Sequence, residues 1–428
     1  MLKKILATTK KVFSNEKVKK KILFTALCFL VFRVMAHIPV PVVDVQRIQE
    51  IFLGSEFLSL LNIFSGGTLI RFSIAAVGIN PFITSQIIIQ LAGMVIPSIK
   101  EMQKEGEAGR AKINQYTRFI AVPLAVVQSI SVIALLKSQE LLTSTDILSL
   151  TAVIFTLVAG AMITLWIGEL ISEYGIGNGV SMILLAGIIS QIPTAVGQAS
   201  IVIFTGQYLI LAIFLILFLA VVSLVVFMNE AVRKVVVQYA KRMRGSRMLG
   251  GQKTHLPIRV NVAGVMPIIF ALSLMLVPSF AGQILQSLEN DWLSRFGGNL
   301  ILWFDQSSVS YMVFYFILVF VFTFFSAIIF FDAEDLSTEL KKSGAYIPGI
   351  RPGSATKTFL EYVVSRVTLV GALFLGFIAL LPSLAQALTN IQSLAIGGTS
   401  VLIVVSVIIE TAKQVESQLV GQDYEKYS

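Results

Sequence analysis

The chain has 428 residues, of which 56% are hydrophobic and only 13% are charged, and its formal net charge at pH 7 is +9. A soluble protein of this length would carry about 25% charged residues, so the composition excludes a soluble globular protein and indicates a polytopic membrane protein. The single cysteine, Cys28, excludes an intramolecular disulfide and a redox thiol pair, and we interpret it as a buried structural thiol.

A lysine-rich segment, residues 1–21, precedes the first apolar run. It resembles the basic part of a signal peptide, but no small-residue cleavage site follows the apolar run. We therefore interpret residues 1–21 as an uncleaved cytoplasmic N-terminal segment.

Ten apolar runs are candidates to cross a hydrocarbon core of about 30 Å. The last run is short, but its helical pattern can continue through ETAKQVESQLV, so we predict a span there as well. The predicted spans are residues 22–38, 72–99, 119–136, 148–170, 180–196, 208–228, 258–280, 309–331, 363–381 and 396–409.

Basic residues gather on alternate loops, together with both termini. All but five of the 33 Lys and Arg residues lie there, which predicts that both termini are cytoplasmic. Two of these loops, residues 229–260 and 332–362, are long enough to protrude as structured elements. They indicate a docking surface for an acidic or RNA-bearing partner; the alternative is that their charge only fixes the membrane topology. The five exceptions are Arg33, Arg47, Arg71, Lys137 and Arg295.

Ionisable groups are absent from the middle of every predicted span, with Arg33 and Arg71 near the outer ends of their segments. Ion-coupled transporters normally place such groups at the midplane, so their absence disfavours an ion-coupled transporter. The broken helices described below are compatible with a transporter as well as with a channel. The two histidines, His37 and His255, have no neighbouring cluster with metal-ligand spacing. The glycine-rich GIGNG lacks the lysine of a nucleotide-binding loop. We predict no catalytic residue, no metal site and no cofactor.

Two spans share an interruption. The second contains VGINP, with Gly78 and Pro81, and the seventh contains AGVMP, with Gly264 and Pro267. Matching breaks in two halves that run in opposite senses point to a translocation site at their interface. Glycine-rich YGIGNGVS and IGGTS likewise precede the fifth and tenth spans. We predict an N-terminal half at 22–204, a C-terminal half at 205–411 and a cytoplasmic tail at 412–428.

The sequence resembles the SecY family of bacterial protein-translocation channels along nearly its whole length. The motifs that carry the resemblance are VFRVMAHIPVP, IFSGGTL, KEGEAGRAKINQYTR, GIGNGVS, THLPIRVNVAGVMP, KKSGAYIPGIRPG, TLVGAL and GGTSVLIVVSVIIE. The resemblance implies an all-α polytopic membrane protein with ten helices in two inverted halves. A short plug helix at about residues 60–72 would close a channel for unfolded polypeptides in the cytoplasmic (inner) membrane.

The resemblance also implies the partners. These are the small membrane subunits SecE and SecG, the SecA motor ATPase, the ribosome, signal peptides, nascent polypeptides and membrane lipid. An ion-coupled secondary transporter remains the alternative function, whereas an intramembrane enzyme would need a nucleophile with its base or a metal cluster.

Four groups of residues follow from matching the family's motifs to this chain. Isoleucine is usual at most places of the pore ring, so Val180 and Leu184 depart mildly from the family pattern. The implied pore ring is Ile79, Ile83, Val180, Leu184, Ile269 and Ile403; the plug is Asn62, Ile63, Phe64, Ser65, Gly66, Gly67, Thr68, Leu69 and Arg71; the lateral gate is Asn80, Thr84, Gln86, Gln90 and Asn261; and the partner-docking residues are Arg242, Arg244, Arg247, Lys253, His255 and Arg351.

Overall fold

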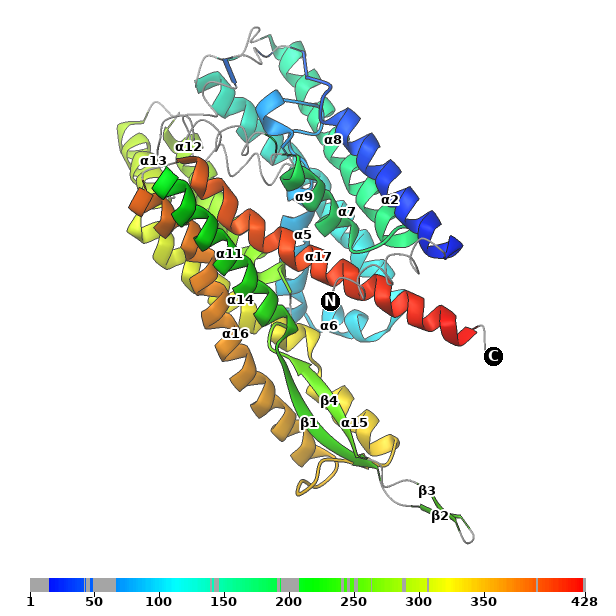
Figure 1. Ribbon diagram of the computed structural model, residues 1–428. Coiled ribbons are helices and arrows are strands. Elements are labelled where there is room, and N and C mark those ends of the chain that lie inside the picture. Colours follow the sequence, from blue (N-terminus) through cyan, green and yellow to red (C-terminus); the bar gives the residue numbers. More distant parts are fainter. Residues whose placement is uncertain are drawn as a thin grey trace.

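The computed structural model is a bundle of long helices from which one β-hairpin projects (Figure 1). It describes residues 15–41, 43, 47–48, 67–138, 141, 146–190, 193, 208–239, 242–244, 247–249, 253–262, 264–286, 290–305, 308–389 and 392–425. Each predicted span contains a helix, and the predicted helical fold class is confirmed. These helices are α2 (Glu16–Met35), α5 (Asn80–Val95), α7 (Glu107–Ser138), α8 (Ile147–Tyr174), α9 (Gly179–Ile189), α11 (Tyr208–Glu230), α12 (Met266–Gln286), α14 (Val309–Phe330), α16 (Ser354–Thr389) and α17 (Gln392–Glu425).

Length and apolarity single out a subset of these helices as membrane spans. Within the described ranges, four stretches are long and apolar enough to cross a membrane alone: three lie in α7, α8 and α16, and the fourth, Val309–Lys342, begins with α14. A fifth span results if α5 and the following helix α6 (Pro97–Lys104) count together. Shorter apolar helices lie in α9, α11 and α12. The predicted continuation of the last span is present, since α17 runs unbroken to Glu425 and includes the glycines of IGGTS.

The second span is shorter than its apolar run of residues 72–99. Helix α5 begins only at Asn80 and ends at Val95, and α6 follows at an angle of 108°. Ile96 is extended, with φ −100° and ψ 111°, because the ring of Pro97 disfavours a helical conformation in the residue before it. Helix α5 therefore covers only the middle of the apolar run that hydropathy predicted as one continuous helix.

The two interrupted spans begin with the same backbone geometry. Gly78 has φ +60° and Gly264 has φ +63°, a left-handed conformation that glycine adopts without steric cost. In each case the helix starts two residues later, and proline is its second residue. The seventh span thus begins at Met266, eight residues after the predicted start at Ile258.

Backbone hydrogen bonds extend this correspondence to particular residues. The amide of Ile83 donates to the carbonyl of Ile79, and the amide of Ile269 donates to the carbonyl of Val265, both at 3.2 Å. Ile83 and Ile269 are therefore equivalent positions of the two halves, and so are Ile79 and Val265. This equivalence supports the predicted inverted repeat.

The first long loop forms a β-hairpin, which the sequence analysis predicted only as a protruding element. Strands β1 (Val232–Tyr239) and β4 (Lys253–Arg259) pair antiparallel, and β5 (Ala345–Tyr346) pairs with the other edge of β1. The short strands β2 (Arg242–Arg244) and β3 (Arg247–Leu249) pair at the far end of the projection (Figure 1).

The second long loop packs against this sheet. Helix α15 (Ala333–Lys342) is capped by Asp332, whose side chain accepts hydrogen bonds from the amides of Glu334 and Asp335. Glu334 also pairs with Lys357 of α16 at 2.8 Å. Buried side chains of the sheet, α15 and α16 form an apolar cluster separate from the main core, so the two loops make one structural unit. That cluster comprises Val235, Val237, Ile258, Ala333, Ala345, Ile347, Leu360 and Val364.

Candidate functional site

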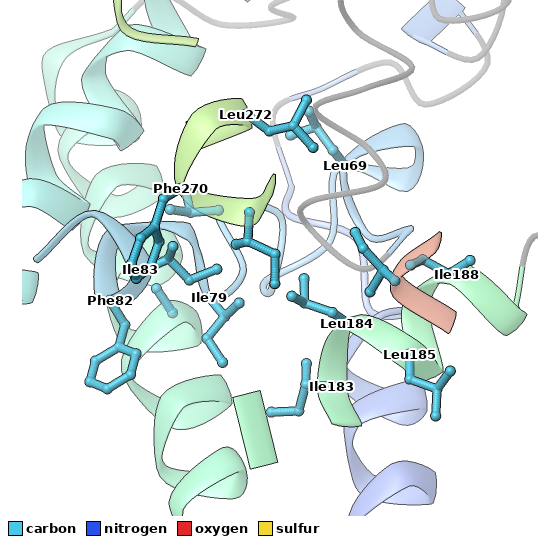
Figure 2. Packing of buried hydrophobic residues seen from close by; sticks show 14 of the residues in the cluster. Leu69, Ile79, Phe82, Ile83, Ile183, Leu184, Leu185, Ile188, Phe270 and Leu272 are labelled. Carbon is cyan, nitrogen blue, oxygen red and sulfur yellow. The ribbon is translucent and has the colours of Figure 1, made fainter. Parts of the chain in front are cut away.

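The six predicted pore-ring residues lie in one apolar cluster. Five have exposed fractions of only 1–2%, and Val180 is half-buried against the same cluster. They come from the start of α5, from α9, from α12 and from α17, so both halves of the chain contribute. Figure 2 shows Ile79 and Ile83 on one side of this cluster and Leu184 of α9 on the other.

The glycine-rich stretch before α9 sets the position of Val180 and Leu184. Asn178 accepts hydrogen bonds from the amides of Val180 and Ser181 at 3.1 and 3.3 Å, and so starts the helix. A Cβ atom on Gly179 would lie only 1.6 Å from the carbonyl oxygen of Gly168 in α8. Glycine is therefore required here for close contact between α8 and α9.

Val265 was missed by the sequence analysis. Its exposed fraction is 2%, it belongs to the same apolar cluster as the ring, and it is the counterpart of Ile79. Lining up VGINP with AGVMP in the sequence would have found it, because both motifs place one residue directly after the glycine.

Only part of the predicted plug lies within the described ranges, and one of its residues belongs to the main apolar core. Residues Asn62, Ile63, Phe64, Ser65 and Gly66 are outside the described ranges, whereas Gly67, Thr68, Leu69 and Arg71 are within them. Leu69 opens the 3₁₀ turn η1 (Leu69–Arg71); it is 4% exposed and shares the apolar cluster of the ring (Figure 2). Arg71 is exposed.

Hydrogen bonds hold the end of the plug segment in place. The hydroxyl of Thr68 donates to the carbonyl of Ala75 at 2.7 Å. The amide of Val40, in the segment after α2, donates to the carbonyl of Phe72 at 2.9 Å. Phe72 is buried although its φ is +41°, a conformation that is strained for a bulky side chain. These contacts connect the plug segment to the first span.

The predicted gate residues divide into two groups. Asn80, Thr84, Gln86 and Gln90 lie on α5, which contacts α7 and α12. Asn80 is 7% exposed, and its Oδ1 atom has no hydrogen-bond partner among the described residues. Asn261 instead donates a hydrogen bond to Asn229 of α11, which is not a gate helix. Four of the five predicted gate residues thus share one helix, and the fifth lies in the segment between β4 and α12.

The predicted docking residues lie along the projecting unit. Lys253 and His255 are exposed on β4, opposite Gln238 and Val236 of β1. Arg351 is exposed between β5 and α16, and the hydroxyl of Thr356 donates to its carbonyl at 2.9 Å. Three further arginines lie in the β2–β3 hairpin: Arg242, Arg244 and Arg247.

Buried charge is absent from the described part of the chain. No Asp, Glu, Lys or Arg there is buried, and no group of three His, Cys, Asp or Glu residues in it could hold a metal ion. A coupling ion in a low-dielectric site needs charge compensation. The six predicted ring residues are all aliphatic, and aliphatic side chains can exclude water and ions but cannot bind them.

The chain matches known proteins along nearly its full length. A family model of SecY matches residues 73–412. Protein translocase subunit SecY of Mycobacterium tuberculosis (strain ATCC 25618 / H37Rv) is 40% identical over 430 residues, covering 96% of each chain. The Streptomyces scabiei subunit of the same name is 38% identical over 442 residues, covering 99% of this chain and 100% of that one.

Solved structures agree in fold. A protein-conducting channel has a TM-score of 0.65 at 18% identity, and Sec61 in a canine ribosome–channel complex from the endoplasmic reticulum has a TM-score of 0.60 at 18% identity. Both alignments cover 93% of this chain and 92% of the other. The extent of the family match, the identity to its members and the shared fold together lead to one conclusion: the chain belongs to the SecY family of protein translocase subunits.

Proposed function

We propose that this chain forms the pore of a protein-conducting channel, closed at its waist by the aliphatic ring. The observation that carries the proposal is that ring residues from both halves are buried in the same apolar core, which also contains Leu69 of the plug segment. A narrow apolar constriction excludes ions by dewetting. It also demands no specific hydrogen bond from a passing polypeptide, so chains of any sequence can cross.

Reconstitution into proteoliposomes tests this function. With SecE, SecG, SecA and ATP present, we expect an unfolded preprotein to become protected from external protease. The absence of protected preprotein, together with uptake of a small solute driven by an ion gradient, would instead favour a secondary transporter.

The channel is proposed to lie in the cytoplasmic membrane with both termini in the cytoplasm. The concentration of basic residues on the projecting unit supports this orientation. That unit would then face SecA or a ribosome, both of which present acidic or phosphate groups to a basic surface. Sec61, which shares the fold, is described in a complex with the ribosome.

The docking role of Arg351 gives one prediction. We expect Arg351→Glu to lower SecA-dependent translocation by about tenfold, because a like charge replaces an exposed cation at the proposed contact. Arg110→Glu, the same change at an exposed site on α7, is the matched control and should retain activity. Translocation is measured as protease-protected preprotein. Equal activity of the two variants would remove Arg351 from the docking surface.

Sideways release of apolar segments into lipid is proposed to occur where α5 and α7 meet α12. Gln90 is a half-buried polar residue of α5 at this seam. In Gln90→Leu, leucine packs in the seam without needing a hydrogen-bond partner, which stabilises the closed gate.

We therefore expect Gln90→Leu to raise the hydrophobicity that a segment needs for insertion, by about 1 kcal/mol of transfer free energy. A series of test segments with increasing leucine content measures this threshold. Thr156→Leu on α8 is the control, since Thr156 is half-buried, as Gln90 is, and its hydroxyl donates to the carbonyl of Ala152 in its own helix. The gate assignment fails if both variants insert the series as the wild type does.

A further inference from the structure

The root of the projecting hairpin is closed by two hydrogen bonds. Asn229, in the last turn of α11, lies just before β1, and Asn261 lies just after β4. The Nδ2 group of Asn261 donates to Oδ1 of Asn229 at 2.8 Å, and the amide of Val260 donates to the carbonyl of Ala231 at 3.0 Å. A displacement of the hairpin would therefore move the end of α11 and the segment after β4 together.

The same asparagine continues the connection to a pore-ring helix. The Nδ2 group of Asn229 donates to the hydroxyl of Ser406 in α17 at 2.7 Å. Ser406 is 5% exposed and lies three residues after Ile403, on the same side of the helix. Two turns further along α17, Lys413 pairs with Glu230 at 2.7 Å. Consecutive residues at the end of α11 thus hold one face of α17.

Helix α17 in turn contacts a second ring helix. The hydroxyl of Thr411 approaches the sulfur of Met182 at 3.6 Å, and Met182 lies in α9 between Val180 and Leu184. The hairpin root is also the start of the segment that leads into α12 and Ile269. The root is therefore connected to three helices that carry ring residues. It leads into α12 along the chain, it bonds to α17 through Ser406, and α17 contacts α9.

The hydrogen bonds among Asn229, Asn261 and Ser406 depend on one another. Oδ1 of the buried Asn261 has no hydrogen-bond partner among the described residues. Loss of Asn229 would leave the amide of Asn261 without its acceptor and the hydroxyl of Ser406 without its donor, and unsatisfied buried groups are costly. The arrangement of these three side chains is thus tightly specified.

We propose that Asn229 is a positioning residue that couples the hairpin root to α17, so that a partner bound on the hairpin displaces Ile403 of the ring. This inference rests on the proposed docking function and names the residue through which docking acts on the seal. A merely structural role would change stability and leave the response to the partner intact.

The experiment uses the complete channel complex in proteoliposomes, with purified ribosomes as the probe. Ribosome binding is measured by co-sedimentation, and ion conductance is measured with and without ribosomes. Two variants break the connection, Asn229→Leu and Ser406→Ala, and their double variant tests whether they act through one bond. Ser273→Ala is the matched control: Ser273 is a buried hydroxyl of α12, 4% exposed, that has no hydrogen-bond partner in the described ranges.

In the wild type and in Ser273→Ala, we expect ribosomes to change the conductance. In Asn229→Leu and Ser406→Ala this change should fall by about fivefold or more at unchanged ribosome affinity. The double variant should lose no more than either single variant.

Wild-type-like responses in both variants overturn the proposal, and so does a wild type that binds ribosomes without any change in conductance. If Asn229→Leu does not fold, Ser406→Ala decides alone, since it removes only one hydroxyl. Absence of ribosome binding to the wild type is recorded separately by co-sedimentation; it refutes the docking function and this inference with it.

Discussion

Replacing Ile83 and Ile403 by serine is expected to raise the resting ion conductance of the closed channel by about tenfold. The two side chains are 1% and 2% exposed and belong to different halves of the chain. Serine is smaller and brings a hydroxyl, so the constriction both widens and becomes wettable. Conductance across a planar bilayer or dye-loaded vesicles measures the effect without any substrate present.

A matched double variant separates leakage from loss of packing. Ile133 of α7 and Ile171 of α8 are also buried in the main cluster, but neither is a ring residue. Truncating a buried isoleucine costs about 2–5 kcal/mol wherever it lies in the core, so Ile133→Ser with Ile171→Ser should destabilise comparably. We expect this pair to leave conductance low. Equal leakage from both double variants would refute the ring as the seal.

Gly160→Ala is expected to destabilise the folded channel by about 3 kcal/mol. An added Cβ atom would lie 1.8 Å from the carbonyl oxygen of Ile74 and 2.6 Å from its carbonyl carbon. Both are backbone atoms of the turn that leads into Ile79, so no flexible side chain can move away. Thermal unfolding of the purified protein in detergent should show a lower midpoint.

Gly298→Ala provides the comparison for this glycine. Gly298 lies in α13 (Asp291–Trp303), and no heavy atom lies within 4 Å of the position that its Cβ would take. Alanine in an open helical position is favoured over glycine by about 0.5–1 kcal/mol. We therefore expect Gly298→Ala to be neutral or slightly stabilising. A Gly160→Ala protein as stable as Gly298→Ala would contradict the close packing of α8 on this turn.

Hydropathy predicted a helix in every span but placed the start of two of these helices much too early. The run from Phe72 and the run from Ile258 are apolar well before their helices start, at Asn80 and Met266. The cause is backbone conformation: the left-handed Gly78 and Gly264 prevent a continuous helix, and hydropathy does not register φ.

The β-hairpin was present in the sequence as a weaker signal. VRKVVVQY alternates buried Val235 and Val237 with exposed neighbours, a period of two that is typical of a strand. Because the loop is rich in Lys and Arg, it was interpreted as a basic docking surface and no strand was predicted in it. Pairing between β1 and β4, across the short β2–β3 hairpin, could not be assigned from local pattern alone.

The candidate site was predicted less completely from the residues than from the family resemblance. Spacing places Ile79 with Ile83 on one helix face, but spacing cannot bring Ile403 beside them. Asn261 was assigned to the gate from the family resemblance. Its partner, Asn229, is separated from it by the whole hairpin, and such tertiary pairs leave no mark in a local pattern.

The shared geometry at Gly78 and Gly264 has a consequence for how the waist is encoded. Ile83 and Ile269 each follow their glycine by five residues, the first in the N-terminal half and the second in the C-terminal half. The same short segment therefore fixes the offset between the left-handed glycine and the buried isoleucine in each half. Lengthening or shortening either helix beyond this segment would leave both offsets unchanged.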